Sequence, residues 1–310
     1  MRALGYSEIE QRFGEAMMAN KLHHAWLLHG IKGIGKRLLA ENLAGLLMCE
    51  THSACGTCHA CLMLAAGSHP DVHAVELLDG KRDINIEQIR GVLEFLSLSG
   101  AESERRVVIV DDAERMNMQA ANSLLKGLEE PAAGSLVLIV CADVNRLPAT
   151  IRSRCMLQNC PPLSDEAVRQ VLTDMEIDDA FIDLAVRLAE GAPGRVECMQ
   201  QREIAQALQQ WQELISDISQ ADIGELEAWI RQHVSQVPHG LITRLLAMQA
   251  YSDLTQRDGG RSYAVKEKLY KAMHTCASWP SDVIQRGLRP APSLLANVLQ
   301  LRTALRAVNT

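Results

Sequence analysis

Hydrophobic runs alternate with helical patterns along the first half of the chain. Three runs are apolar over most of their length and predict buried strands, at 25–29, 106–112 and 136–141. Apolar residues at helical spacing follow the first run, a second helical pattern opens near Asp83, and a third runs from Asn117 to Glu130, where Pro131 stops it. Strands that alternate with helices indicate an α/β domain with a parallel sheet.

The remainder of the chain has helical patterns only. Ser164-Asp-Glu-Ala is typical of a helix start, and Gly-Ala-Pro-Gly at 191–194 breaks the pattern. Two apolar stripes at helical spacing follow, formed by Ile204, Leu208, Trp211, Leu214, Ile215 and Ile218 and by Leu294, Leu295, Val298, Leu301, Leu305 and Val308. The predicted domains are an α/β domain at 1–162, a helical lid at 163–200 and an all-α bundle at 201–310. Each stripe is either the bundle's own core or an assembly surface.

A glycine-rich segment after the first predicted strand has the spacing of a phosphate-binding loop. It reads Gly-Ile-Lys-Gly-Ile-Gly-Lys-Arg from Gly30 to Arg37, which fits Gly-x4-Gly-Lys, normally followed by Ser or Thr. Gly30, Gly33 and Gly35 let backbone N–H groups surround phosphates, and Lys36 reaches the β- and γ-phosphates. Arg37 replaces the hydroxyl that ligates Mg²⁺, and a guanidinium has no lone pair for a metal. The loop predicts an NTPase architecture without efficient metal-dependent chemistry.

Acidic residues follow the second predicted strand. Asp111 stands where P-loop ATPases carry an aspartate that supports Mg²⁺. The next position, where a glutamate orients the attacking water, holds the shorter Asp112, and Glu114 lies two residues further. Alternatively, these acids cap the start of the next helix, whose dipole favours negative charge. We favour the capping role, because the metal-binding hydroxyl is already missing at Arg37.

Four of the nine cysteines lie close together, at Cys49, Cys55, Cys58 and Cys61. Two overlapping C-x-x-C steps can place thiolates around one ion at the Zn–S distance of about 2.3 Å, and Cys49 supplies the fourth ligand. A Cys₄ shell has no open position, so the bound zinc would be structural. Two neighbouring histidines lie outside the C-x-x-C rhythm. The alternative is a set of unliganded thiols on a surface loop.

Composition indicates the class of protein and its compartment. The 310 residues are 47% hydrophobic and 22% charged, which is ordinary for a globular protein of two or three domains. The net charge of −7 argues against strong autonomous binding to nucleic acid, which usually needs a basic face. Acidic residues interrupt the first 20 positions and no run approaches the roughly 20 apolar residues of a membrane span. We expect a cytoplasmic protein with reduced thiols.

Four segments occur in the same order as in the clamp-loader subunits of bacterial DNA polymerase III, members of the AAA+ ATPase group, and the chain resembles them. The segments are His24-Ala-Trp-Leu-Leu-His-Gly with its loop, the four-cysteine loop, Asn122-Ser-Leu-Leu-Lys-Gly-Leu-Glu-Glu-Pro131, and Leu147-Pro-Ala-Thr-Ile-Arg-Ser-Arg-Cys155. The resemblance is dense over 20–160, and the last two segments are highly specific in combination. The chain is most similar to the delta-prime type, which keeps the fold but has degenerate ATPase motifs.

The resemblance implies a catalytic role for Arg154. In the family, the arginine of Ser-Arg-Cys reaches across a subunit boundary to the γ-phosphate of ATP held by a neighbour. Such an arginine finger stabilises the charge that spreads over the transferred phosphoryl group. By spacing alone, Arg152 and Arg154 would both be surface charges, and Arg152 keeps that interpretation.

The resemblance also implies further losses and a set of partners. Cys141-Ala142 replaces polar residues that sense the phosphate, and the position of a sensor arginine holds Gly194, with Arg195 one step beyond. We therefore expect a largely non-hydrolysing stator in a five-membered ring of clamp-loader subunits, in which 201–310 would be part of a collar formed by the C-terminal helical domains. Through the ring it would act on the sliding clamp and primer–template DNA, as part of the DNA-directed DNA polymerase holoenzyme, a nucleotidyltransferase.

Two other functions compete with this one. An active clamp-loader ATPase needs ATP turnover by the chain alone, which Arg37 disfavours. A zinc-bearing DNA-binding module needs a basic stretch interleaved with aromatic residues, which the sequence lacks.

Overall fold

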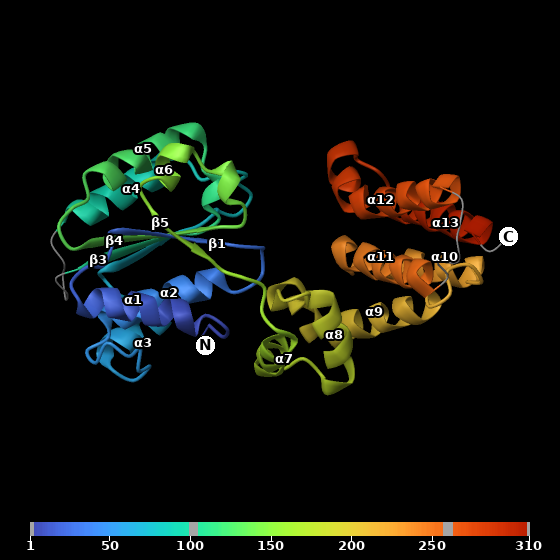
Figure 1. The fold of residues 1–310 in the computed structure, drawn as a ribbon, viewed down its shortest axis with the longest axis horizontal. Helices are drawn as coiled ribbons and strands as arrows, with labels where there is room; N and C mark the ends of the chain where they lie inside the picture. The colour runs from blue at the N-terminus through green and yellow to red at the C-terminus, as the bar shows by residue number, and fades with distance from the viewer. Residues whose placement is uncertain (1–2, 99–104, 257–262, 309–310) are drawn as a thin grey trace. The chain divides into compact units, whose positions relative to one another are not determined.

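The computed structural model describes residues 3–98, 105–256 and 263–308 (Figure 1). The chain divides into two compact units. The first comprises Met1–Val168 with Glu190–Gly194, and the second comprises Arg169–Ala189 with Arg195–Thr310. The sequence predicted three domains, and a separate lid at 163–200 stays a prediction.

A five-stranded parallel sheet with the order β2-β3-β4-β1-β5 forms the centre of the first unit. Its strands are β1 (Ala25–His29), β2 (Val72–Val75), β3 (Arg106–Val110), β4 (Ser135–Cys141) and β5 (Met156–Asn159). In the register, Ala25 of β1 lies opposite Val137 of β4, and Trp26 lies opposite Met156 of β5. The three predicted strands are confirmed, although the two acids of 106–112 lie beyond the end of β3. The edge strands β2 and β5 are only four residues long and partly exposed, so they lack an apolar run.

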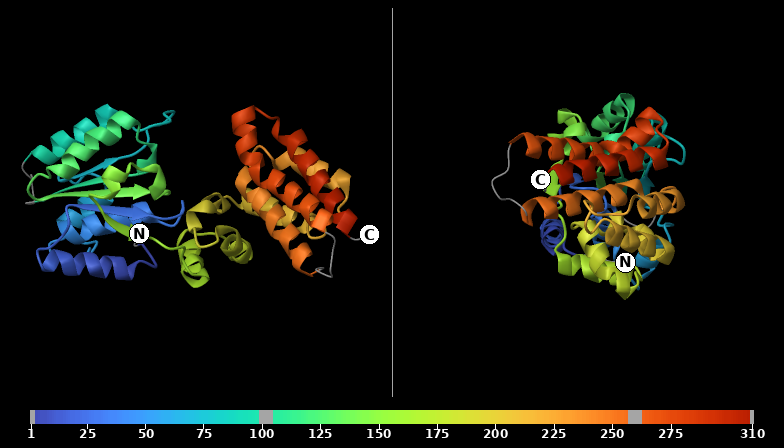
Figure 2. Two further views of the ribbon diagram at one scale, coloured as in Figure 1. Left: turned by 45° about the horizontal axis from the view of Figure 1, so that its top comes forward. Right: turned by 90° about the vertical axis from the view of Figure 1, so that its right-hand side faces the viewer.

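Helices cover both faces of the sheet and make three layers (Figures 1 and 2). One layer holds α1 (Ser7–Met18), α2 (Lys36–Met48) and α3 (His59–Ala65), and the other holds α4 (Ile86–Ser97), α5 (Met118–Glu129) and α6 (Ala149–Arg152). Short 3₁₀ turns, η1 (Ala113–Arg115) and η2 (Val144–Arg146), follow β3 and β4. Because both faces are covered, the central strands are buried along nearly all of their length, which explains their apolar runs.

Side-chain caps fix where α4 and α5 begin. Asn85 accepts a hydrogen bond from the backbone N–H of Gln88 and forms a capping box with it, so α4 begins three residues later than the predicted Asp83. Asn117 accepts a bond of 2.8 Å from the N–H of Ala120 and begins α5 as predicted.

From α7 onward the chain is helical. The elements are α7 (Asp165–Asp174), η3 (Asp179–Phe181), α8 (Ile182–Ala189), η4 (Pro193–Arg195), η5 (Glu197–Gln200), α9 (Arg202–Leu214), α10 (Ile223–His233), α11 (His239–Gln256), α12 (Tyr263–Arg286) and α13 (Pro290–Val308). The predicted cap is present, because Ser164 Oγ accepts a bond from the N–H of Ala167. Within the described residues, no helix has both the length and the apolar character needed to cross a bilayer.

Most of the described residues in the two apolar stripes are buried inside the helical unit, and Leu214 and Leu295 are half-buried. Along the first stripe Ile204, Leu208 and Trp211 are buried on α9, and the indole of Trp211 stacks on that of Trp229 at 4.4 Å. The helix ends at Leu214, so the rest of that stripe lies in the following turns. Four residues of the second stripe are buried on α13, namely Leu294, Val298, Leu301 and Leu305, whereas the Val308 side chain is not among those described. These residues therefore form the bundle's own core.

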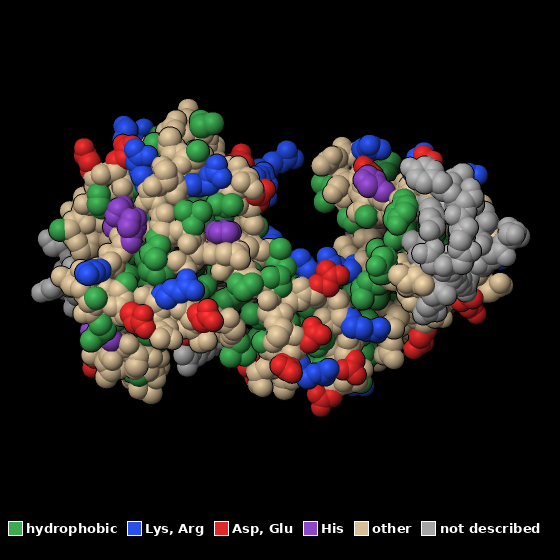
Figure 3. Space-filling view, viewed as in Figure 1, with side chains coloured by type: hydrophobic (Ala, Val, Ile, Leu, Met, Phe, Trp, Pro, Cys, Tyr) green, Lys and Arg blue, Asp and Glu red, His purple; other side chains and the backbone are tan. Residues whose placement is uncertain are grey.

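Figure 3 shows the charged side chains on one face of the molecule. On this face, basic and acidic side chains are interspersed over each unit, with apolar side chains between them. Among the described side chains on this face, no large patch of a single sign is seen.

Candidate functional site

The predicted phosphate-binding loop connects β1 to α2, so the strand–loop–helix context of a P-loop is present. Gly30, Gly33 and Gly35 have φ angles of 155°, 88° and 89°, in the region that favours glycine. Gly35 is the N-cap residue of α2, whose first residue is Lys36. The loop therefore has the backbone arrangement that surrounds phosphate at the N-terminus of a helix.

Lys36 is buried, and its ammonium group binds to backbone carbonyl groups of the loop. Its Nζ donates hydrogen bonds to the carbonyl oxygens of Gly30 at 2.8 Å and Ile31 at 2.9 Å. Burial lowers the pKa of Lys36, and the nearby thiol of Cys160 opposes that change. Lys36 is thus held in place by the same loop that would bind phosphates.

Two more contacts hold carbonyl groups of the loop. The Tyr6 hydroxyl donates to the carbonyl of Ile34, and the N–H of Gly194 donates to the carbonyl of Gly33, both at 2.9 Å. A Cβ atom at position 194 would lie 3.0 Å from that carbonyl oxygen. Gly194, at the position where a sensor arginine was expected, therefore packs closely against the loop. Arg195 donates instead to a carbonyl at the end of α8.

Replacing Gly30 with alanine should destabilise the first unit by about 2–5 kcal/mol, through overpacking and unfavourable φ together. An added Cβ would lie 2.2 Å from the carbonyl oxygen of Cys160. Gly14→Ala is the matched control, because Gly14 lies inside α1 and an added Cβ meets no atom within 4 Å. Urea unfolding of both variants measures the difference, and equal midpoints would contradict this account of Gly30.

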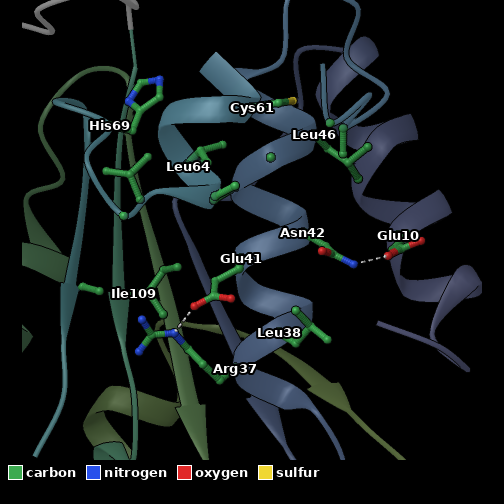
Figure 4. A pocket seen from close by; sticks show the side chains of 18 of the residues that line it. Glu10, Arg37, Leu38, Glu41, Asn42, Leu46, Cys61, Leu64, His69 and Ile109 are labelled. Carbon is green, nitrogen blue, oxygen red and sulfur yellow. Dashed lines mark hydrogen bonds and ion pairs between the residues drawn. The ribbon is translucent and has the colours of Figure 1, made fainter. Parts of the chain in front are cut away.

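Arg37 lies among three carboxylates from three different segments. Its Nε is 2.8 Å from Oε1 of Glu41, one turn along α2 (Figure 4). Its Nη1 is 3.8 Å from Oε2 of Glu76, just after β2, and 3.7 Å from Oδ2 of Asp111, just after β3. The guanidinium therefore contacts the aspartate that supports Mg²⁺ in P-loop ATPases.

The other acids at this end of β3 also have partners within the chain. Asp112 lies 3.5 Å from Nζ of Lys32, and Oε1 of Glu114 accepts a hydrogen bond of 3.1 Å from the N–H of Ala142. Asp112 stands at the N-cap of the short η1 turn but makes no side-chain capping bond there, and α5 is capped by Asn117. The capping role of these acids stays a prediction. Burial raises the pKa of Asp111, while the N–H of Asp112 and the charge of Arg37 lower it.

These residues do not fit a magnesium ion in the manner of a P-loop ATPase. Mg²⁺ needs oxygen ligands at about 2.0–2.1 Å in octahedral geometry. Arg37 supplies only donors, and its guanidinium lies against Asp111. Asp112, at the position of the water-orienting glutamate, pairs with a lysine.

A pocket of about 620 Å³ lies beside α2 in the first unit. In Figure 4, Arg37 and Glu41 lie at one end, and Cys61 and His69 lie at the other. Ile109 of β3 forms part of its apolar lining. The pocket thus extends from the phosphate-loop helix to the cysteine loop.

The four predicted cysteines come together in the structure. The Sγ atoms of Cys49, Cys55, Cys58 and Cys61 all lie within 4.8 Å of one another, and those of Cys49 and Cys58 are 3.9 Å apart. Cys49 and Cys61 are buried, whereas Cys55 is exposed. This set of thiols at this spacing can hold one metal ion, which would be ligated by all four.

The environment of the thiols favours thiolate at two of the four positions. Burial raises the pKa of Cys49, but hydrogen bonds from the backbone N–H of Cys55 and from the Thr51 hydroxyl outweigh it and lower the pKa to about 4. Hydrogen bonds from Thr57 lower the pKa of Cys55 to about 7. Burial raises the pKa of Cys61 to about 12. Since thiolate is the form that binds metal, Cys49 is already suited to that role.

Arg154 lies between α6 and β5 with about a third of its side chain exposed. Its Nη2 is 2.7 Å from Oε1 of Glu129, and its Nη1 donates to the carbonyl of Thr150 at 3.1 Å. Arg152 donates instead to Oδ1 of Asn145 at 3.3 Å. The two arginines of the segment are therefore held by different partners.

Sequence reasoning missed several residues that contact the predicted site. They are Tyr6, Glu41, Glu76 and Glu129. Glu41 was accessible, because it is four residues after Arg37 on one helix face. Glu129 lies in the quoted segment Asn122–Pro131, but nothing in that segment predicts its ion pair with Arg154. Tyr6 and Glu76 come from segments distant in sequence, and no local pattern identifies them.

Comparison with known proteins identifies the family. A sequence model of the family described as "DNA polymerase III, delta subunit" matches residues 5–164, more than half of the chain. The chain belongs to this family. The predicted resemblance to subunits of the delta-prime type is confirmed.

Several relatives carry the name DNA polymerase III subunit delta'. The one from Pseudomonas aeruginosa is 44% identical over 141 residues, covering 44% of this chain and 43% of the relative. The one from Escherichia coli is 34% identical over 180 residues, covering 57% of this chain and 54% of the relative. The matched segment thus spans about half the length of these curated relatives.

A solved structure confirms the predicted fold class. The DNA polymerase III gamma subunit-related protein of Thermotoga maritima superposes with a TM-score of 0.51 at 17% identity, covering 97% of this chain and 99% of that one. This likeness extends over both units of the chain.

Proposed function

We propose that the chain is a largely non-hydrolysing stator in a bacterial DNA polymerase III clamp loader. It supplies Arg154 in trans to the ATP held by a neighbouring ATPase subunit, and so assists loading of the sliding clamp onto primed DNA. The observation that carries the proposal is the contrast between its two nucleotide-related elements. Its own P-loop has a guanidinium against the metal-supporting aspartate, while Arg154 stays partly exposed on a family motif.

The state of the P-loop supports the non-hydrolysing part. Hydrolysis needs a metal to neutralise the phosphates and a group to position water. Here Arg37 pairs with Asp111, Asp112 pairs with Lys32, and Glu114 is engaged by a backbone N–H. Each group that would serve the reaction already has another partner in the chain.

The exposure and chemistry of Arg154 support the finger. Its guanidinium is planar and permanently charged, and it can bind two phosphate oxygens at once. A hydrogen bond to Thr150 and an ion pair with Glu129 hold the side chain in a defined position while part of it stays accessible. When a neighbouring subunit presents its ATP, the phosphate would replace the exposed carboxylate of Glu129 as the partner of Arg154, because phosphate carries more negative charge.

We also propose that the metal of the cysteine cluster is zinc. Thiolate ligands select soft or borderline cations, and four of them in a closed shell are typical of structural zinc. Cys49, Cys55, Cys58 and Cys61 would hold the ion, which links the end of α2 to the start of α3. The ion would stabilise the loop and would take no part in a chemical reaction.

ATP hydrolysis by the isolated full chain tests the proposal. With Mg²⁺ present, the chain alone should release phosphate at the rate of a protein-free control. Adding it to candidate ATPase subunits should raise their turnover, because a finger is then offered in trans. Rapid turnover by the chain alone would favour an active ATPase, and no effect on the partner subunits would contradict the stator role.

A DNA-binding module outside any ring is the weaker alternative. On the face in Figure 3, basic and acidic side chains are mixed, and the net charge is −7. Binding of this kind depends on a concentration of Lys and Arg.

A further inference from the structure

The contacts of Arg37 extend beyond those of an ordinary helix-surface ion pair. Its partner Glu41 follows at i+4 on α2, a spacing that is common on exposed helices. Its Nη1, however, reaches Glu76 after β2 and Asp111 after β3, at 3.8 Å and 3.7 Å. The guanidinium thus joins three segments that share no local sequence.

The position of Arg37 is that of the metal-binding hydroxyl in a P-loop. It follows the loop lysine directly, and it lies against the strand-end aspartate. Within the described residues, Nη1 of Arg37 is shielded from solvent and makes no hydrogen bond, so its contacts with Glu76 and Asp111 are purely ionic. Its Nε donates a hydrogen bond to Glu41, so the guanidinium has one directional bond and two ionic contacts with carboxylates. A positive charge in contact with carboxylate oxygens is the role that a metal cation fills in this class of loop.

We propose that the guanidinium of Arg37 is a built-in cation that replaces Mg²⁺ and keeps divalent cations out of this loop. Three carboxylates surround it, so removal of its charge would leave Glu41, Glu76 and Asp111 close together without their common partner. Carboxylate oxygens are the ligands that Mg²⁺ and Mn²⁺ prefer. This inference deepens the proposed function, because it names the side chain that excludes the metal.

Mn²⁺ binding by the isolated full chain, followed by electron paramagnetic resonance, tests the inference without nucleotide. The zinc cluster is loaded beforehand, and Mn²⁺ prefers oxygen to thiolate ligands. Arg37→Ser removes the charge and restores the hydroxyl, and it should bind Mn²⁺ at least tenfold more tightly than the unmodified chain. Arg37→Lys should bind as weakly as the unmodified chain, because the ammonium keeps the positive charge.

Two further variants make the result decisive. Arg37→Gln keeps most of the side-chain length without the charge, so it replaces Arg37→Ser if that variant fails to fold, and it too should gain Mn²⁺ binding. Arg12→Ser is the matched control, because Arg12 also pairs with a glutamate on its own helix, Glu8 at 3.6 Å, and lies on α1, outside the phosphate-binding loop. It should leave Mn²⁺ binding unchanged.

The outcome is independent of ATP hydrolysis. Equal Mn²⁺ affinities of the unmodified chain, Arg37→Ser and Arg37→Gln would overturn the inference, even if the chain proved to be a non-hydrolysing stator. Tight Mn²⁺ binding by the unmodified chain would overturn it as well. Gain of Mn²⁺ binding by the uncharged variants alone supports it, whether or not the assembled complex depends on Arg154.

Discussion

Replacing Arg154 with alanine should lower the ATP turnover of the reconstituted clamp loader by on the order of 10³-fold at the site that receives the finger. The reason is electrostatic, since the proposed finger would neutralise charge that develops on the phosphoryl group transferred in the neighbouring subunit. Arg154→Lys should recover little of this loss, because an ammonium lacks the planar fork that contacts two oxygens. Single-turnover hydrolysis by the complex measures the effect directly.

Arg152→Ala is the matched control for Arg154. It lies two residues away and donates to Asn145, so it tests whether any loss of positive charge in this segment slows the reaction. Turnover should stay within about twofold of the unmodified complex, as for a surface residue outside the site. Comparable losses in the two variants would contradict a specific finger, and so would full activity of Arg154→Ala.

Folding of the Arg154 variant is not expected to be the cause of its defect. The ion pair with Glu129 is partly exposed on both sides, and such pairs contribute about 0–1 kcal/mol. The free energy of unfolding of Arg154→Ala should therefore stay close to that of the unmodified chain. Thermal unfolding alongside the turnover assay separates the two effects.

The central sheet and the cysteine cluster were accessible from sequence because each has a strong local signal. Strands buried on both faces, such as β3 and β4, are apolar along most of their length. The cysteines indicate a metal site, because thiolates around one ion need the short spacing of Cys55, Cys58 and Cys61. In both cases the physical requirement falls on residues that are close in sequence.

The edge strands and the acid contacts were not accessible in the same way. β2 and β5 each pair on one side only, so their sequences need no apolar run. The ion pairs of Asp111 and Asp112 had no local signal, because the partner Arg37 comes from the helix after β1 and the partner Lys32 from the loop before that helix. Parallel strands bring their carboxyl ends to one edge of the sheet, and this proximity follows from topology rather than from local pattern.

The boundaries of the helical half show a third kind of limit. The first stripe predicted one helical face from Ile204 to Ile218, yet α9 ends at Leu214. Ile215 and Ile218 are nevertheless fully buried in the turns that follow. Tertiary packing thus preserved the burial that the apolar pattern predicts while it changed the local conformation.

Removal of the metal from the cysteine cluster should unfold the loop between Cys49 and Cys61 while the sheet stays folded. Every residue from Glu50 to Ala60 is exposed or half-buried, so the loop has no hydrophobic core of its own. Ligation by four thiolates is then its main source of order, since structural zinc contributes folding free energy directly. Hydrogen exchange before and after chelation should show faster exchange in this loop and little change in β1, β3 and β4.

Single ligand replacements refine this prediction. Cys49→Ser and Cys61→Ser should each reduce the metal content from about one zinc ion per chain to a small fraction, because a hydroxyl is a poor substitute for a thiolate. Cys198→Ser is the control, since this half-buried thiol lies in the helical unit and outside the cluster. Elemental analysis after dialysis distinguishes the variants. Full zinc content in Cys49→Ser would show that the four thiols do not form one closed ligand shell, and unchanged exchange after chelation would show that packing alone holds the loop.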